Sequence, residues 1–190
     1  MAYAVFLSFD AASTAAIRSF TSTLSLPGLV AQMGVAPHIS LAGFTEAEPA
    51  ALLDVTRHFA SLEAPLDIDL QSLGAFASPD RVLFLAPVVT KALLEMHKRF
   101  HALLGSAGLR ATDYWLPGQW VPHCTLEQHL TAAQLGEAMT AASQTFQPIR
   151  GVLGQVNLVG FWPLEPMLTL PLTMLASEVV PPDAPAPSVE

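Results

Sequence analysis

One five-residue pattern constrains this chain more than any other feature, because it occurs twice. Pro-His-x-Ser/Thr-Leu appears as PHISL at residues 37–41 and as PHCTL at residues 122–126. Each copy begins a segment rich in strand-forming residues. Two interpretations are open. The copies are either two unrelated β-strands that each hold a structural histidine, or an internal duplication that brings two histidines to one site.

The order of the predicted elements favours the duplication. Each copy opens a strand that follows a helix and a loop, and each strand precedes a helix with a predicted capping box, Thr45 with Glu48 and Thr131 with Gln134. The sequence pattern predicts strands over 3–9, 38–44, 66–77, 81–89, 123–129, 151–162 and 167–175, and helices over 11–24, 46–61, 90–104 and 131–145. This order predicts an α+β fold of two pseudo-symmetric lobes, each an antiparallel sheet with helices packed outside, and an active cleft between the lobes.

The two lobes are expected to form one domain over residues 1–175, with the repeated motifs at 38–41 and 123–126. Residues 176–190 are rich in proline and lack apolar periodicity, which predicts a tail outside the core. The apolar N-terminus has no basic start, so it is predicted to be a first strand and not a signal peptide. No stretch of about 18 residues lacks a polar or breaking residue, so neither a transmembrane helix nor a membrane partner is expected.

The charge of the chain limits its ligands. Only 13% of the residues are charged, and 8 Lys and Arg against 16 Asp and Glu give a net charge of -8. Broad nucleic-acid surfaces depend on many cation–phosphate contacts, so a small ligand is favoured and an RNA end is disfavoured. The single cysteine, Cys124, excludes an intramolecular disulfide and fits a reducing compartment, which predicts a cytoplasmic location.

The motif residues are suited to proton transfer at a phosphate. Side chains alternate along a strand, so His38 shares a face with Ser40, and His123 shares a face with Thr125. Cys124 then points into the core. Imidazole exchanges a proton near neutral pH, and a hydroxyl donates a hydrogen bond to an anionic oxygen without adding charge. Two histidines on opposite sides of a phosphorus suit in-line displacement, one as base and one as acid, and this arrangement requires no metal.

These two His-x-Ser/Thr motifs, each preceded by Pro and followed by Leu on a duplicated scaffold, resemble the 2H phosphoesterase superfamily. Within it the chain is similar to bacterial 2′-5′ RNA ligase-like and cyclic phosphodiesterase proteins, over roughly residues 3–175. The resemblance implies that His38 and His123 are catalytic and that Ser40 and Thr125 bind the phosphate. It also implies hydrolysis of 2′,3′-cyclic phosphates or other 2′-linked phosphodiesters, and some members ligate RNA ends.

The second motif continues with a feature that the first lacks. Strand alternation places Glu127 on the face of His123 and Thr125, where the first copy has Ala42. A carboxylate there would hold a histidine in its charged form or repel a phosphate. His129, two residues further on, is the candidate partner of Glu127, so both are expected to surround the site.

Four further residues are candidate substrate contacts. Trp115 and Trp120 precede the second motif; they either anchor the loop or stack a base or sugar at the mouth of the cleft. Arg81 and Arg150 begin predicted strands and are either solvated or reach a phosphate.

Two other histidines have a spacing that metal sites use. His97 and His101 lie four residues apart on a predicted helix. No third ligand is evident in the sequence, so a solvated or half-buried helix face is expected and no metal site is predicted.

Together these observations predict a metal-independent phosphodiesterase that needs no cofactor and hydrolyses a 2′,3′-cyclic phosphate, or a similar 2′-linked diester, of a small nucleotide-like substrate. Two alternatives stay open. One is a 2′-5′ RNA ligase or its reverse reaction, and the other is a non-catalytic nucleotide-binding module.

Overall fold

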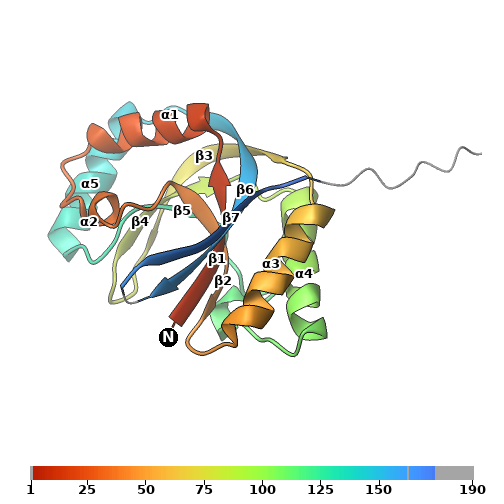
Figure 1. Cartoon of the computed structure of the whole chain (residues 1–190). Coiled ribbons are helices and arrows are strands. Elements are labelled where there is room, and N and C mark those ends of the chain that lie inside the picture. Colours follow the sequence, from red (N-terminus) through yellow and green to blue (C-terminus); the bar gives the residue numbers. More distant parts are fainter. Residues whose placement is uncertain (1, 162, 174–190) are drawn as a thin grey trace, which may run out of the picture.

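The computed structural model describes residues 2–161 and 163–173 (Figure 1). The elements are β1 (Ala2–Phe9), α1 (Ala11–Ser22), α2 (Leu29–Gln32), β2 (His38–Phe44), α3 (Pro49–Leu62), β3 (Leu66–Phe76), β4 (Val82–Pro87), α4 (Lys91–Ser106), the 3-10 turn η1 (Asp113–Trp115), β5 (Cys124–Glu127), α5 (Ala132–Thr145), β6 (Ile149–Phe161) and β7 (Glu165–Pro171). The predicted tail from residue 176 lies outside the described residues.

All strand pairs are antiparallel, and the sheet order is β2-β1-β6-β3-β4-β5, with β7 also on β6. The long strand β6 is where the two lobes join. Its first part, 149–153, pairs with β3, and its later part, 155–160, pairs with β7, while β1 runs along it as well. The predicted α+β fold is therefore confirmed, with the strands of both lobes joined through β6 in one continuous seven-stranded sheet.

The helices cover the sheet in two pairs (Figure 1). On one side α1 packs with the end of α5 through Phe20 and Phe146, the residue after α5, whose ring centroids are 5.3 Å apart. On the other side α3 packs with α4 through Phe59 and Phe100, at 5.0 Å. The first helix of each repeat thus packs beside the second helix of the other repeat, which binds the lobes together.

Both motif strands contain a β-bulge at the same place. In β2, Val5 of β1 pairs with Ala42 and the next residue, Phe6, pairs with Ser40, so Leu41 is the extra residue. In β5, Leu83 of β4 pairs with Glu127 and Phe84 pairs with Thr125, so Leu126 is the extra residue. A bulge changes which face the following residues occupy. The two motifs therefore share a backbone irregularity as well as a sequence pattern.

The helix starts follow the sequence with one exception. Asp10 accepts a hydrogen bond from the Ser13 amide, and Thr131 and Gln134 form the predicted capping box. The predicted box of Thr45 with Glu48 is wrong: α3 starts at Pro49, and Glu48 makes no side-chain cap. Proline fits the first helical position and restricts the residue before it to extended backbone, so it sets this start. Within the described residues, no helix is long and apolar enough to cross a membrane.

Candidate active site

A cleft of about 990 Å³ lies where β2 and β5 come together. His38, Ser40, His123 and Thr125 all line it. Each of these side chains is half-buried. The four motif residues that the sequence places on one face of each strand therefore meet at one cavity.

The two imidazoles are held in the same way. The Nδ1 atom of His38 lies 2.8 Å from the carbonyl oxygen of Ala36, and Nδ1 of His123 lies 2.7 Å from that of Val121. A carbonyl only accepts, so in each neutral ring Nδ1 carries the hydrogen and Nε2 has a free lone pair. Each carbonyl belongs to the residue before the motif proline. Since proline restricts the residue before it to extended backbone, this gives the repeated proline a role in orienting the histidine.

Both histidines are biased toward the neutral form. Burial is the main cause that lowers the pKa of His38; the bond to Ala36 raises it, and repulsion by His123 lowers it again. Burial also lowers the pKa of His123, opposed by the bond to Val121. Repulsion between the rings favours a state in which at most one of them is protonated. A pair with one neutral and one protonated imidazole holds a base and an acid at once.

Aromatic rings stand beside both histidines. Phe6 lies 4.3 Å from His38 between ring centroids, and Phe84 lies 5.3 Å from His123. These phenylalanines occupy equivalent positions, because Phe6 pairs with Ser40 and Phe84 pairs with Thr125. Phe76 adds a further edge contact to His123 at 4.8 Å. Sequence analysis missed these residues, because only the register between strands shows that they face the motif.

Trp115 lines the cleft and contacts both halves of the site. Its ring is nearly parallel to His123, at 17° and 6.3 Å. It also lies over Gly43 of β2, where an added Cβ would come within 2.8 Å of the Trp115 Nε1 atom. The glycine thus leaves the room that this indole occupies. Trp115 is half-buried, so part of its ring is open to a ligand.

Trp120 lines the cleft and anchors β2 beside the site. It is 9% exposed, its Nε1 donates to the carbonyl of Ser40 at 3.0 Å, and its ring stacks on His97 at 3.9 Å. His101 Nε2 lies 3.1 Å from the carbonyl of Leu41. The predicted solvated or half-buried helix face is wrong for His97, which is buried, whereas His101 is half-buried as predicted. Burial lowers the pKa of His97 to about 4. These residues hold the backbone that carries Ser40.

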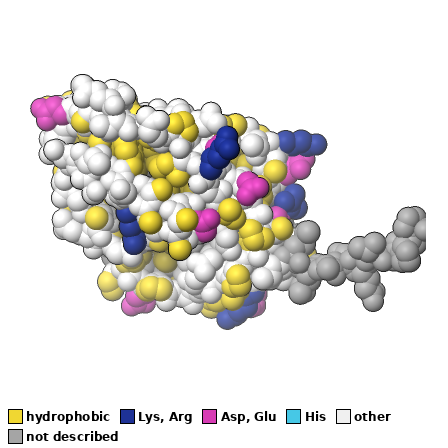
Figure 2. All heavy atoms as spheres, turned by 90° about the horizontal axis from the view of Figure 1, so that it is seen from above, with side chains coloured by type: hydrophobic (Ala, Val, Ile, Leu, Met, Phe, Trp, Pro, Cys, Tyr) yellow, Lys and Arg dark blue, Asp and Glu magenta, His cyan; other side chains and the backbone are white. Residues whose placement is uncertain are grey.

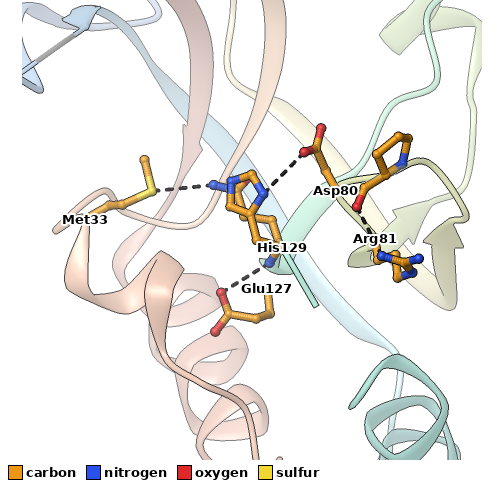
Figure 3. A network of polar contacts seen from close by, with 7 residues as sticks. Met33, Asp80, Arg81, Glu127 and His129 are labelled. Atoms are coloured by element: carbon orange, nitrogen blue, oxygen red, sulfur yellow. Dashed lines mark hydrogen bonds and ion pairs between the residues drawn. The ribbon is translucent and has the colours of Figure 1, made fainter. Parts of the chain in front are cut away.

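The predicted position of Glu127 is wrong. Its carboxylate does not line the cleft but accepts hydrogen bonds from the amides of Gly28, Leu29 and Val30, at 2.6, 3.0 and 3.0 Å. The bulge at Leu126 turns Glu127 to the buried face, so strand alternation fails there. In Figure 3 Glu127 points away from Asp80 and His129. Glu127 therefore fixes the start of α2, a helix that the sequence did not predict.

His129 is not the partner of Glu127. It faces Asp80 instead, with Nδ1 3.3 Å from Oδ1, and its amide donates to the Asp80 carbonyl (Figure 3). Arg81, the residue after Asp80, directs its Nη1 atom to the carbonyl oxygen of Pro79 at 3.3 Å and does not line the cleft. His129 and Arg81 both have positive φ, 59° and 40°. The Asp80–His129 contact closes one rim of the cleft.

The remaining candidates lie elsewhere. Arg150, the second residue of the central strand β6, lies 3.5 Å from Asp69 and does not line the cleft; its exposed side chain fits the solvated interpretation, and a substrate contact stays a prediction. Cys124 is fully buried, as predicted, and burial raises its pKa to about 12. No group of three or more His, Cys, Asp or Glu side chains within residues 2–161 and 163–173 is arranged to hold a metal.

Comparison with known protein families identifies the family to which this chain belongs. The model of the 2′-5′ RNA ligase superfamily matches residues 10–161. The chain belongs to this superfamily, the 2H phosphoesterases. The resemblance carried by the two motifs is confirmed, and membership supports an enzyme that acts on phosphodiesters. No curated protein matches the chain in sequence.

Solved structures share the fold of this 2H phosphoesterase. TT0787 of Thermus thermophilus superimposes with a TM-score of 0.63 at 17% identity, over 92% of this chain and 99% of that one. Escherichia coli LigT complexed with 3′-AMP superimposes with a TM-score of 0.61 at 14% identity, over 90% of this chain and 98% of that one. Kluyveromyces marxianus Usb1 superimposes with a TM-score of 0.52 at 13% identity, over 90% of this chain and 98% of that one. At these low sequence identities the likeness shows a shared fold alone.

Proposed function

We propose that the protein is a metal-independent phosphodiesterase that hydrolyses a 2′,3′-cyclic phosphate, or a similar 2′-linked diester, of a small nucleotide-like substrate. The observation that carries this proposal is the matched pair of imidazoles. His38 and His123 line one cleft, and each has Nδ1 held by a carbonyl, which leaves Nε2 available. No second partner for either Nε2 is present in the described part of the chain. A cytoplasmic location remains a prediction.

The reaction follows from these positions. The neutral histidine takes a proton from water through Nε2 as the water oxygen forms a bond to phosphorus. The bond from phosphorus to one ribose oxygen breaks, and the protonated histidine gives its proton to that oxygen. The product is a phosphomonoester with a free neighbouring hydroxyl, and the two histidines have exchanged protonation states. Ser40 and Thr125 donate hydrogen bonds to the non-bridging oxygens.

The test is turnover of 2′,3′-cyclic mononucleotides by purified protein in excess chelator, with the product isomer identified. His38→Ala and His123→Ala should each lower kcat/KM by about 10²–10⁴-fold, and the double variant by far less than the product of the two effects. His58→Ala, at an exposed position of α3, is the matched control and should be neutral. Normal rates in either folded cleft variant would remove that histidine from the scheme.

Three outcomes would favour another function. Activity lost in chelator and restored by a divalent ion would replace the scheme with metal-assisted hydrolysis. Joining of RNA ends would favour a 2′-5′ RNA ligase. Nucleotide binding without any turnover would favour a non-catalytic binding module.

A further inference from the structure

The cleft contains no basic side chain other than its histidines. All 8 Lys and Arg residues of the chain fall within the described residues, and none of them lines the cleft. Those paired with acidic side chains are Arg57, Lys91, Arg99, Arg110 and Arg150. On the face drawn in Figure 2 the basic side chains are scattered among acidic and apolar ones and form no stripe.

The only Asp or Glu side chain that lines the cleft within the described residues is Asp80. It stands at the rim, with 64% of its side chain exposed, opposite His129. A phosphate bound near this rim would therefore meet a negative charge and no lysine or arginine among the lining residues, since the neighbouring Arg81 directs its Nη1 atom to the carbonyl of Pro79. Like charges brought together on binding are unfavourable, and they are screened less in a cleft than in open water.

The inner part of the cleft suits one negative charge. A phosphodiester carries a single charge, and one protonated imidazole balances it, while Ser40 and Thr125 offer neutral donors. Beyond these groups the walls are uncharged apart from Asp80. They are largely aromatic and apolar, with Phe6, Phe76, Tyr114 and Trp115 among them, and their other polar side chains are neutral: Thr45, Ser78, Thr112, Gln119 and Gln128. Such rings accept a flat, uncharged group by stacking.

We infer that the cleft selects phosphodiesters that carry one negative charge on a flat and otherwise uncharged body, and that it discriminates against substrates with a second phosphate. This inference rests on the proposed function. It makes a nucleoside 2′,3′-cyclic phosphate a better substrate than the same nucleoside with a 5′-phosphate or within an RNA chain.

Three matched substrates test the inference: adenosine 2′,3′-cyclic phosphate, its 5′-phosphate, and its 5′-methanesulfonate ester, which is close to the phosphate in size but uncharged. The 5′-phosphate should lower kcat/KM at least about tenfold, mainly through KM, and the sulfonate ester should change it little. Equal rates for all three would overturn the inference, and so would equal losses for phosphate and sulfonate, because size would then be the cause.

Charge variants sharpen the test. Asp80→Lys should raise kcat/KM for the 5′-phosphate relative to the parent substrate by at least about fivefold, because it replaces repulsion by attraction. Glu137→Lys makes the same change of charge at an exposed site on α5 and should leave that ratio unchanged. Arg81→Gln should also leave it unchanged; a loss specific to the 5′-phosphate there would show that Arg81 binds it and would overturn the inference.

If none of the three compounds is turned over, the proposed function fails, and calorimetric titration of the same compounds tests the inference separately. Tighter binding of the parent and the sulfonate ester than of the 5′-phosphate supports charge selection, and equal affinities overturn it.

Discussion

Leu41 and Leu126 are each the extra residue of a β-bulge, and they occupy the same position in the two motifs. Each bulge follows the motif hydroxyl directly. The histidine and the hydroxyl therefore keep their common face toward the cleft, while the residue after the bulge leucine turns into the protein. In the first motif that residue is the buried Ala42, and in the second it is Glu127.

Glu127→Gln should destabilise the protein. The carboxylate accepts from three consecutive amides at the start of α2, and an amide side chain offers one oxygen and places donors against donors. We expect a loss of about 1–3 kcal/mol in the free energy of unfolding, measured in urea. The amides of Gly28, Leu29 and Val30 should also exchange hydrogen faster.

Glu137→Gln, at an exposed position of α5, is the control and should change stability by less than about 0.5 kcal/mol. An unchanged unfolding midpoint for Glu127→Gln would mean that these three amides contribute nothing to stability.

The pH dependence of kcat/KM should be a bell with its maximum below pH 6.5. The pKa values of His38 and His123 are both lowered in the free enzyme. The acid must be protonated, and its protonated fraction falls as the pH rises above its pKa. The base must be neutral, and its neutral fraction falls as the pH drops below its pKa. Rates between pH 5 and 9 for adenosine 2′,3′-cyclic phosphate would check this; a rate that rises to a plateau above pH 7 would contradict it.

His97 should make the protein less stable in acid. Its pKa is lowered to about 4 in the fold, against 6.5 in an unfolded chain. The unfolded state therefore binds the proton first, so this contribution is complete above pH 6.5 and is lost as the pH falls toward 4. His97→Phe keeps a ring against Trp120 and removes the titration. The drop in unfolding free energy between pH 7 and 4.5 should then be about 2 kcal/mol smaller than in the wild type.

His101 lies 4.4 Å from His97 between ring centroids and its charge acts on His97, so the difference reports His97 together with its coupling to His101. Parallel pH curves for the wild type and His97→Phe would show that this residue is not the source.

Gly43→Ala should move Trp115. The new methyl group would lie 2.8 Å from Nε1 of the indole, which is closer than van der Waals contact allows. If Trp115 stacks on the base of the substrate, KM for a cyclic nucleotide should rise about 5- to 100-fold. Gly136→Ala is the control, because a Cβ there meets open space on α5. An unchanged KM for Gly43→Ala would exclude a stacking role for Trp115.

The sequence predicted the parts of the site that depend on local alternation. His38 with Ser40 and His123 with Thr125 precede the bulges, so the two-residue period holds for them. It fails at Glu127, because a bulge inserts one residue without a change in the apolar pattern. The helix α2 has four residues after Gly28, too few to show a helical period. Phe6 and Phe76 face the histidines through strand pairing, which a single sequence does not reveal.

A terminal strand normally presents free backbone groups to which another chain can add a strand, and this is a common start of aggregation. β2 is a terminal strand, yet its carbonyls at Ser40, Leu41 and Gly43 already accept hydrogen bonds, from Trp120, His101 and Thr112. The contacts that hold the first motif in place therefore also block strand addition along this edge. A variant such as Trp120→Ala would be expected to lose solubility as well as order at Ser40.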